Sequence, residues 1–258
     1  MKQTLTIICL LVALSIQGQE NIEFTYEYQA KPRKSKPEYI QHEDITLITN
    51  GKKSLFISPV ELIKDSIVNA LKKSGDNYLS ELQYQMSKQP KYKVKYSIYQ
   101  ENGNYLFSDK VFTSEIGYKE TINHKWILEN EFKEILGHSC QLAITKYQGR
   151  TYNCWFSRDI PINHGPYKFH GLPGMILEVY DTDMFFHFTV KSIKTKEVNF
   201  PELEFNNITF TNIEDYQDLK FNTFLIFMRK RSPKSMEKLL PKYEAKQKDQ
   251  RYIEIFTE

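Results

Sequence analysis

The sequence has few cysteines, glycines and prolines and no long apolar segment. Its 258 residues include 3 Cys, 10 Gly and 10 Pro, too few for a disulfide-rich scaffold, a collagen-like repeat or a low-complexity chain. No stretch reaches the roughly 18 consecutive apolar residues that a membrane-spanning helix needs. Lysine and arginine total 35 against 32 aspartate and glutamate, and this net charge of +3 gives no reason to expect a nucleic acid as partner.

Motifs of the common enzyme classes are also missing. There is no Gly-x-Ser-x-Gly elbow, phosphate-binding loop, dinucleotide fingerprint or Cys-x-x-Cys pair. The 6 histidines match no HExxH or other metal-ligand spacing. We therefore assign no cofactor, no metal and no catalytic residue from the sequence, and an enzyme is the less favoured class of protein.

The first nineteen residues have the order of a signal peptide. Lys2 supplies a positive charge, residues 4–16 are almost entirely apolar, and Gly18 is a small residue suited to a cleavage site. Thirteen residues of helix are about 20 Å long, short of the roughly 30 Å of bilayer hydrocarbon. The sequence therefore predicts cleavage near Gly18 or Gln19 and a periplasmic or otherwise exported chain. No change of composition marks a linker, so we expect one domain over residues 20–258.

Alternation of apolar and polar residues predicts strands through most of the chain. It is clear in residues 22–28 and 92–98, and Asn50-Gly51, Gln148-Gly149 and residues 181–183 provide turns between further strands. The Asp-Thr-Asp sequence at 181–183 also has a spacing found in calcium sites, but a hairpin turn explains it better. Within 92–98, lysines and apolar residues alternate, which is ordinary patterning for an amphipathic strand.

Helical spacing is confined to a few segments. Ser58 and Glu61 have the spacing of a capping box, which predicts a helix from there to Gly75. Residues 213–230 and 234–246 are expected to form two more helices. The sequence thus predicts an α+β, β-rich fold with a predominantly antiparallel, curved sheet and two or three helices. By analogy, this layout is similar to the half-barrel of outer-membrane lipoprotein carriers.

One segment carries a family resemblance. Residues 171–176, Gly-Leu-Pro-Gly-Met-Ile, closely resemble the motif that names the GLPGLI family of exported bacterial envelope proteins. The chain also resembles the family pattern at Ile160-Pro161, residues 165–169, Trp126 and residues 137–140. Met175 stands where the second Leu of the motif is expected, and Cys154 where a small residue such as Ala is expected. The resemblance implies an envelope protein of a Gram-negative phylum with no established reaction.

The same motif predicts a tight turn. Leu172-Pro173-Gly174-Met175 suits a type II turn, in which Gly174 takes the position with positive φ, and Gly171 permits a close backbone approach. The turn is either a buried structural corner or the rigid wall of a ligand or partner site. The candidate residues for such a site are Arg150, Asp159, His164, Tyr167, His170, Gly171, Leu172, Pro173 and Gly174.

These candidates support more than one kind of function. Arg150 and Asp159 are expected to form an ion pair that orders the loop. The leading hypothesis is a non-enzymatic binding or accessory protein for an apolar or peptide-like ligand, or for an outer-membrane protein partner. Its basis is that a curved, aromatic-rich sheet can leave an apolar concavity uncovered. The alternatives are an envelope hydrolase or metal-dependent enzyme that uses His164, His170 and Asp159, and a purely structural subunit.

Two cysteines remain once Cys9 is removed with the signal peptide. Export favours a disulfide, but a hairpin centred on Gln148-Gly149 pairs Cys140 with Ser157 and Cys154 with Ala143. The two thiols then point to opposite faces of the sheet, whereas a disulfide needs Cβ atoms about 3.5–4.5 Å apart. The sequence therefore predicts that Cys140 and Cys154 are not bonded to each other.

Overall fold

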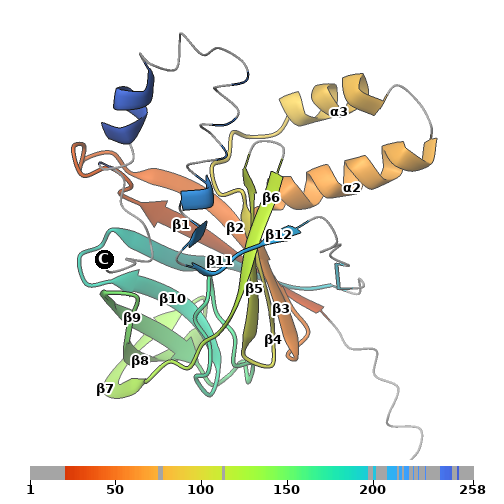
Figure 1. Cartoon of the computed structure of the whole chain (residues 1–258). Helices are drawn as coiled ribbons and strands as arrows, with labels where there is room; N and C mark the ends of the chain where they lie inside the picture. The colour runs from red at the N-terminus through yellow and green to blue at the C-terminus, as the bar shows by residue number, and fades with distance from the viewer. Residues whose placement is uncertain are drawn as a thin grey trace, which may run out of the picture.

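The computed structural model describes residues 21–74, 78–111, 114–196, 200–201 and 208–213, and shorter stretches between 215 and 249. Within them, twelve strands form one sheet (Figure 1). The strands are β1 (Asn21–Ala30), β2 (Gln41–Thr49), β3 (Lys53–Ile57), β4 (Tyr96–Glu101), β5 (Asn104–Val111), β6 (Ser114–Thr121), β7 (Ile127–Ile135), β8 (His138–Tyr147), β9 (Arg150–Ser157), β10 (Met175–Asp181), β11 (Phe186–Lys196) and β12 (Ile208–Phe210). Two helices, α2 (Pro59–Ser74) and α3 (Tyr78–Ser87), connect β3 to β4.

The sheet is open and almost entirely antiparallel. Its strand order is β12-β6-β5-β4-β3-β2-β1-β11-β10-β9-β8-β7, and β12 and β6 are its one parallel pair among the described strands. Figure 1 shows the strands curving, with β7 to β10 set at an angle to β3 to β6 and with α2 and α3 projecting from one end. The expected fold class, a β-rich α+β protein with a predominantly antiparallel sheet, is confirmed.

The predicted hairpins have the expected registers. Thr49 pairs with Ser54 around Gly51, whose φ is 81°. Gln148 and Gly149 both have positive φ, as a two-residue hairpin turn of type I′ requires. Ala143 pairs with Cys154 as expected, and the two described cysteines are both free thiols.

Two strands differ from the prediction. β4 begins at Tyr96 rather than Tyr92, because the Glu43 carboxylate accepts hydrogen bonds from the backbone N–H groups of Lys93 (2.9 Å) and Val94 (3.1 Å) outside the sheet. β6 was not expected, since Gly117 interrupts its apolar pattern. A Cβ at Gly117 would lie 2.5 Å from the Phe107 carbonyl oxygen, so the glycine permits a close approach between neighbouring strands.

The first helix starts where it was predicted, but its capping box does not form. The Ser58 Oγ atom is buried and has no hydrogen-bond partner among the described residues, and the Glu61 N–H donates to the Ser58 carbonyl oxygen (3.0 Å). The Glu61 carboxylate instead points away from the helix end, as described below. The described residues within 213–230 and at 239–245 are helical as expected, and the rest of 234–246 lies outside the described residues.

The expected signal peptide, residues 1–19, lies outside the part of the chain that the structure describes. Of the helices that are described, none combines the length and the apolar character needed to cross a membrane.

The connection between β9 and β10 packs inside the curve of the sheet. We call residues 158–174 the plug. Residues 164–169 within it are all buried, and the plug contacts Thr49 on β2, Tyr96 on β4 and Tyr118 on β6, which lie on the half of the sheet opposite to its own flanking strands. The plug therefore covers apolar surface that the curved sheet alone would expose to water.

Candidate functional site

His164 anchors the plug to β2. Its Nδ1 atom lies 2.8 Å from the Thr49 Oγ1 atom, and its carbonyl oxygen accepts a hydrogen bond from the Ile176 N–H (2.9 Å). Burial, with a smaller contribution from His170, lowers the pKa of His164 to about 4. The ring is therefore neutral at neutral pH and acts as a hydrogen-bonding core residue.

Lys168 is a buried cation that the sequence analysis did not single out. Its side chain is 0% exposed, forms an ion pair with Glu120 and donates a hydrogen bond to the Tyr118 hydroxyl (2.8 Å). The ammonium lies 4.7 Å from the centroid of the Tyr118 ring and 5.4 Å from those of Phe107 and Tyr167. This aromatic cage offsets part of the cost of burying the charge and joins the plug to β5 and β6.

His170 lies at the far end of the plug and is held through its backbone. Its carbonyl oxygen accepts a hydrogen bond from the Trp126 Nε1–H (2.9 Å), and its ring centroid is 5.5 Å from that of His124. His124 in turn contacts the Lys168 carbonyl oxygen through Nε2 (3.0 Å), and burial lowers its pKa to about 4. Trp126 and the two histidines thus fix the backbone of the family-like motif.

The two glycines of that motif have exchanged their expected roles. The positive φ is at Gly171 (90°), whereas Gly174 is not among the residues with positive φ. A Cβ at Gly174 would lie 2.1 Å from the Ser157 carbonyl oxygen. The predicted type II turn is therefore wrong, and Gly174 is required because the backbone after β9 approaches it closely. Leu172 is buried and Pro173 is exposed.

The predicted ion pair between Arg150 and Asp159 is also wrong. The two residues flank opposite ends of β9, and Arg150 donates to the Asp181 carboxylate (3.2 Å) at the hairpin end. Asp159 accepts a hydrogen bond from the Ser139 N–H (3.2 Å) and lies 3.8 Å from His138. Among the described residues, no three His, Cys, Asp or Glu side chains come together as metal ligands.

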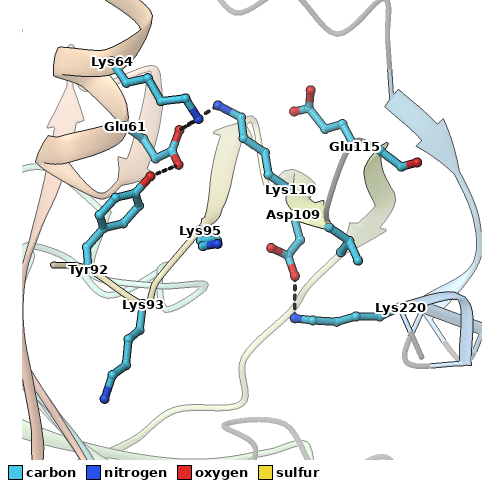
Figure 2. Close-up of a pocket in the computed structure, with 11 residues that line it drawn as sticks. Glu61, Lys64, Tyr92, Lys93, Lys95, Asp109, Lys110, Glu115 and Lys220 are labelled. Carbon is cyan, nitrogen blue, oxygen red and sulfur yellow. Dashed lines mark hydrogen bonds and ion pairs between the residues drawn. The ribbon is translucent and has the colours of Figure 1, made fainter. Parts of the chain in front are cut away.

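A second region, which the sequence analysis did not identify, is a depression open to solvent and lined mostly by charged side chains. A cavity of about 580 Å³ opens between α2, the residues before β4, the ends of β5 and β6, and Lys220 (Figure 2). We call it the polar cleft. Its lining consists of Glu61, Lys64, Tyr92, Lys93, Lys95, Asp109, Lys110, Val111, Ser114, Glu115 and Lys220.

Each carboxylate of the polar cleft already has a partner. Glu61 accepts hydrogen bonds from Tyr92 (2.6 Å) and Lys110 (2.8 Å), and these outweigh the effect of burial and lower its pKa. Burial lowers the pKa of Lys110, but its bond to Glu61 and the charges of Asp65, Glu61 and Glu115 together outweigh burial and raise it. Asp109 is bound by Lys220 (2.6 Å) and Tyr216, and Glu115 accepts from the Ser108 hydroxyl. Glu61 and Lys110 are therefore both charged at neutral pH.

The lining carries an excess of positive charge. Five lysines face three lining carboxylates, and Asp65 outside the lining lies 3.4 Å from Lys110, which leaves an excess of one positive charge. Lys95 is exposed and forms no ion pair with any residue that the structure describes. In Figure 2 it lies between the Glu61 cluster and the Asp109–Lys220 pair. The polar cleft thus presents ammonium groups to a ligand that brings its own negative charges.

Comparisons with known proteins agree with the fold but do not identify a reaction. A family model described as a protein of unknown function (Porph_ging) matches residues 145–178, which include the whole plug. Two structures of PNGF-II, in space groups C2 and P21, are similar to this chain, with TM-scores of 0.51 and 0.52 at 17% sequence identity. The alignments cover 78% of this chain and 33% of PNGF-II, so the chain spans about a third of that protein. No curated protein matches the chain.

Proposed function

We propose that this protein is an exported envelope protein of the GLPGLI type that binds an acidic, peptide-like ligand in the polar cleft without catalysis. Its compartment is supported by the signal-peptide order of residues 1–19. The family is supported by the motif at residues 171–176, which lies inside the segment matched by the family model. The binding role rests on one observation, the excess of lysines over carboxylates in the polar cleft.

The architecture favours a peptide-like ligand over an apolar one. The plug occupies the interior of the curved sheet, where an apolar ligand was expected, and its residues 164–169 are buried. A cavity of about 580 Å³ falls within the range of small-ligand sites. Peptide carboxylates can accept hydrogen bonds from the lysines, and peptide N–H groups can donate to Glu115. An acidic segment of an outer-membrane protein would be bound by the same groups.

The geometry gives no support to the alternative of a hydrolase or metal enzyme near the motif. His164 is buried against Thr49, whereas Asp159 lies on a turn beside Ser139 and His138. A general acid or base must reach its substrate within hydrogen-bond distance, and His164 is already engaged inside the core.

Titration calorimetry with the chain lacking residues 1–19 tests the proposal. We expect N-acetyl-triglutamate amide to bind and the corresponding triglutamine peptide not to bind. The double substitution Lys95→Gln and Lys110→Gln should weaken binding about tenfold or more. Lys125→Gln combined with Lys194→Gln removes the same charge from exposed positions outside the cleft and should leave binding unchanged. Equal binding of both peptides would contradict the proposal.

The export component has its own test. N-terminal sequencing of the protein purified from its native envelope should begin between Gln17 and Asn21, because the small residue Gly18 follows the apolar segment. A chain that retains Met1 would contradict export through a cleaved signal peptide.

A further inference from the structure

The edge strand β7 lies at the opposite end of the strand order from the polar cleft (Figure 1). Among the described strands it pairs only with β8, so its other edge is open. We propose that this edge binds an extended segment of another protein, which adds to the sheet as a further strand and carries cationic and apolar side chains on one face. The proposal is independent of ligand binding in the polar cleft.

The hairpin geometry indicates which backbone groups of β7 point outward. Residues 136 and 137 form a two-residue turn and both have positive φ. The residues that flank such a turn, here Ile135 and His138, are joined by backbone hydrogen bonds. Because these groups alternate in direction along a strand, the N–H and C=O groups of Phe132 and Glu134 point away from β8.

A contact on β8 supports this assignment. Ser139 pairs with Glu134 across the hairpin, but its N–H donates to the Asp159 carboxylate (3.2 Å) on the side of β9. Ser139 therefore does not use this N–H to bind Glu134, as expected for a pair without mutual backbone hydrogen bonds. The backbone of Glu134 is left facing the open edge.

Exposed apolar side chains gather on β7 and the turn after it. Thirteen large apolar side chains are exposed among the described residues, and four of them lie within residues 127–136, namely Ile127, Leu128, Phe132 and Leu136. Leu128 and Phe132 pair with residues 143 and 141 of β8, which are two positions apart, so both side chains lie on one face of the sheet. Phe132 is 61% exposed. Such a concentration is typical of a surface that contacts a partner.

The face that carries Leu128 is the face that the plug covers elsewhere. Its partner Ala143 pairs with Cys154 of β9, and Tyr152, two residues earlier, packs against Phe169 of the plug with ring centroids 4.7 Å apart. Ala143 and Cys154 are 0% exposed, whereas Leu128 is 47% exposed. The covered apolar surface therefore ends at β8, and one further strand would extend it over β7.

The charge of β7 indicates the chemistry of the partner. Three glutamates lie on the strand: Glu129, Glu131 and Glu134. None of them forms an ion pair with a residue that the structure describes. Lys133 does not neutralise them, because it binds Glu178 and lies 4.4 Å from the centroid of the Trp155 ring, on the face opposite to Phe132. Arg158 lies over the Phe156 ring in β9, two strands from β7.

These carboxylates restrict which strand can pair. A second copy of this chain would bring three more glutamates to the same edge, so repulsion disfavours self-pairing. The acidic side chains and the register shift between Leu128 and Phe132 also disfavour uncharged strands. A segment that places lysine or arginine opposite Glu134 and an apolar residue opposite Phe132 complements both groups.

A synthetic strand tests the proposal on the unmodified protein. The peptide acetyl-Lys-Thr-Val-Thr-Lys-Thr-Val-Thr-Lys-amide carries lysine and valine on one face. We expect it to bind the chain lacking residues 1–19, measured by fluorescence anisotropy, about tenfold or more tightly than the peptide with glutamate for lysine. An added strand turns only every second N–H toward β7. N-methylation of the central lysine and both valines, or of the two central threonines instead, should therefore weaken binding in one case only. Equal binding of the two forms would overturn strand addition.

Substitutions at one position locate the site. Glu134→Lys should weaken binding about tenfold or more, whereas Asp183→Lys, the same charge change at an exposed turn, should leave it unchanged. Glu134→Pro removes an outward N–H, which an edge strand tolerates, and should also weaken binding; melting curves verify that it folds. Undiminished binding to Glu134→Lys would exclude β7 as the site. In sedimentation the parent chain should be monomeric, and a dimer that Glu134→Pro dissociates would assign the edge to a second copy.

Discussion

The plug and the polar cleft use the same residue type in opposite ways. In the plug, Lys168 is 0% exposed, enclosed by aromatic rings and paired with Glu120. In the polar cleft, Lys95 is exposed and unpaired within the described residues, and the ammonium of Lys93 donates to the exposed Tyr39. A buried and fully paired cation can hold a fold together, whereas an exposed excess of cations can bind a ligand.

Under the proposed function, the most recognisable segment is not the binding surface. The glycine-rich motif is conspicuous because its backbone is tightly constrained, at Gly174 by a neighbouring carbonyl group and at Gly171 by its positive φ. The polar cleft consists of lysines and acids that resemble any solvated surface in the sequence. The two regions can therefore be separated by substitutions that act on stability in one and on binding in the other.

The largest effect is expected in the plug. Gly174→Val places a branched side chain against the Ser157 carbonyl oxygen, which a Cβ would approach to 2.1 Å. The substitution should cost about 3–5 kcal/mol and leave little folded protein. Urea denaturation, monitored by tryptophan fluorescence, measures this loss of unfolding free energy. Gly137→Ala is the control, because no atom lies within 4 Å of a Cβ there, and its positive φ should cost only about 1 kcal/mol.

Lys168→Met should have the next largest effect. Removing the ammonium leaves the Glu120 carboxylate without this partner, and the unfolding free energy should fall by about 3 kcal/mol. Lys95→Met in the polar cleft should change it by less than about 0.5 kcal/mol. Adding Glu120→Gln to Lys168→Met should recover part of the loss, and a purely additive double variant would show that the two charges do not interact.

The expected strands and hairpins were largely predictable because they depend on local alternation and turn residues. The hydrogen-bond partners of the buried polar groups were not predictable from the sequence. Glu61 has the correct spacing for a capping box, yet its carboxylate binds Tyr92 and Lys110, which are 31 and 49 residues away in sequence. Arg150 likewise pairs with Asp181 rather than with Asp159, because the pairing of β9 with β10 places Asp181 at the same end of β9 as Arg150. These pairings depend on tertiary contacts, which the spacing of residues within a short segment cannot reveal.

Acidic pH should lower the unfolding free energy by a smaller amount, through His164 in the plug. The folded-state pKa of His164 is about 4 and that of an unfolded histidine is about 6.5. Below pH 6.5 the unfolded chain therefore takes up the proton first, so stability is complete above that pH and decreases as the pH falls toward 4. Between pH 8 and pH 5 His164 should account for a loss of about 2 kcal/mol. His164→Gln should flatten this part of the pH dependence, and an unchanged slope would contradict the buried, neutral ring.

Adding a reducing agent should change the stability of the protein least of all. Cys140 and Cys154 are buried free thiols, and burial raises the pKa of Cys140 to about 11. A reducing agent should therefore shift the melting temperature by less than about 1 °C, since no disulfide is lost. Two thiols per chain should react with a thiol reagent after denaturation and almost none before it. A chain with no reactive thiol after denaturation would show that the two cysteines are bonded.

The central position of β1 has a consequence for how the chain assembles. Residues 21–30 pair on one side with β2, which follows directly, but on the other side with residues 186–196 of β11. The middle of the sheet therefore joins parts of the chain about 165 residues apart, and long-range pairings of this kind slow folding because distant segments must meet first. A growing chain that ends before β11 leaves one edge of its first strand open, and the two halves of the sheet can be joined only as residues 186–196 are made.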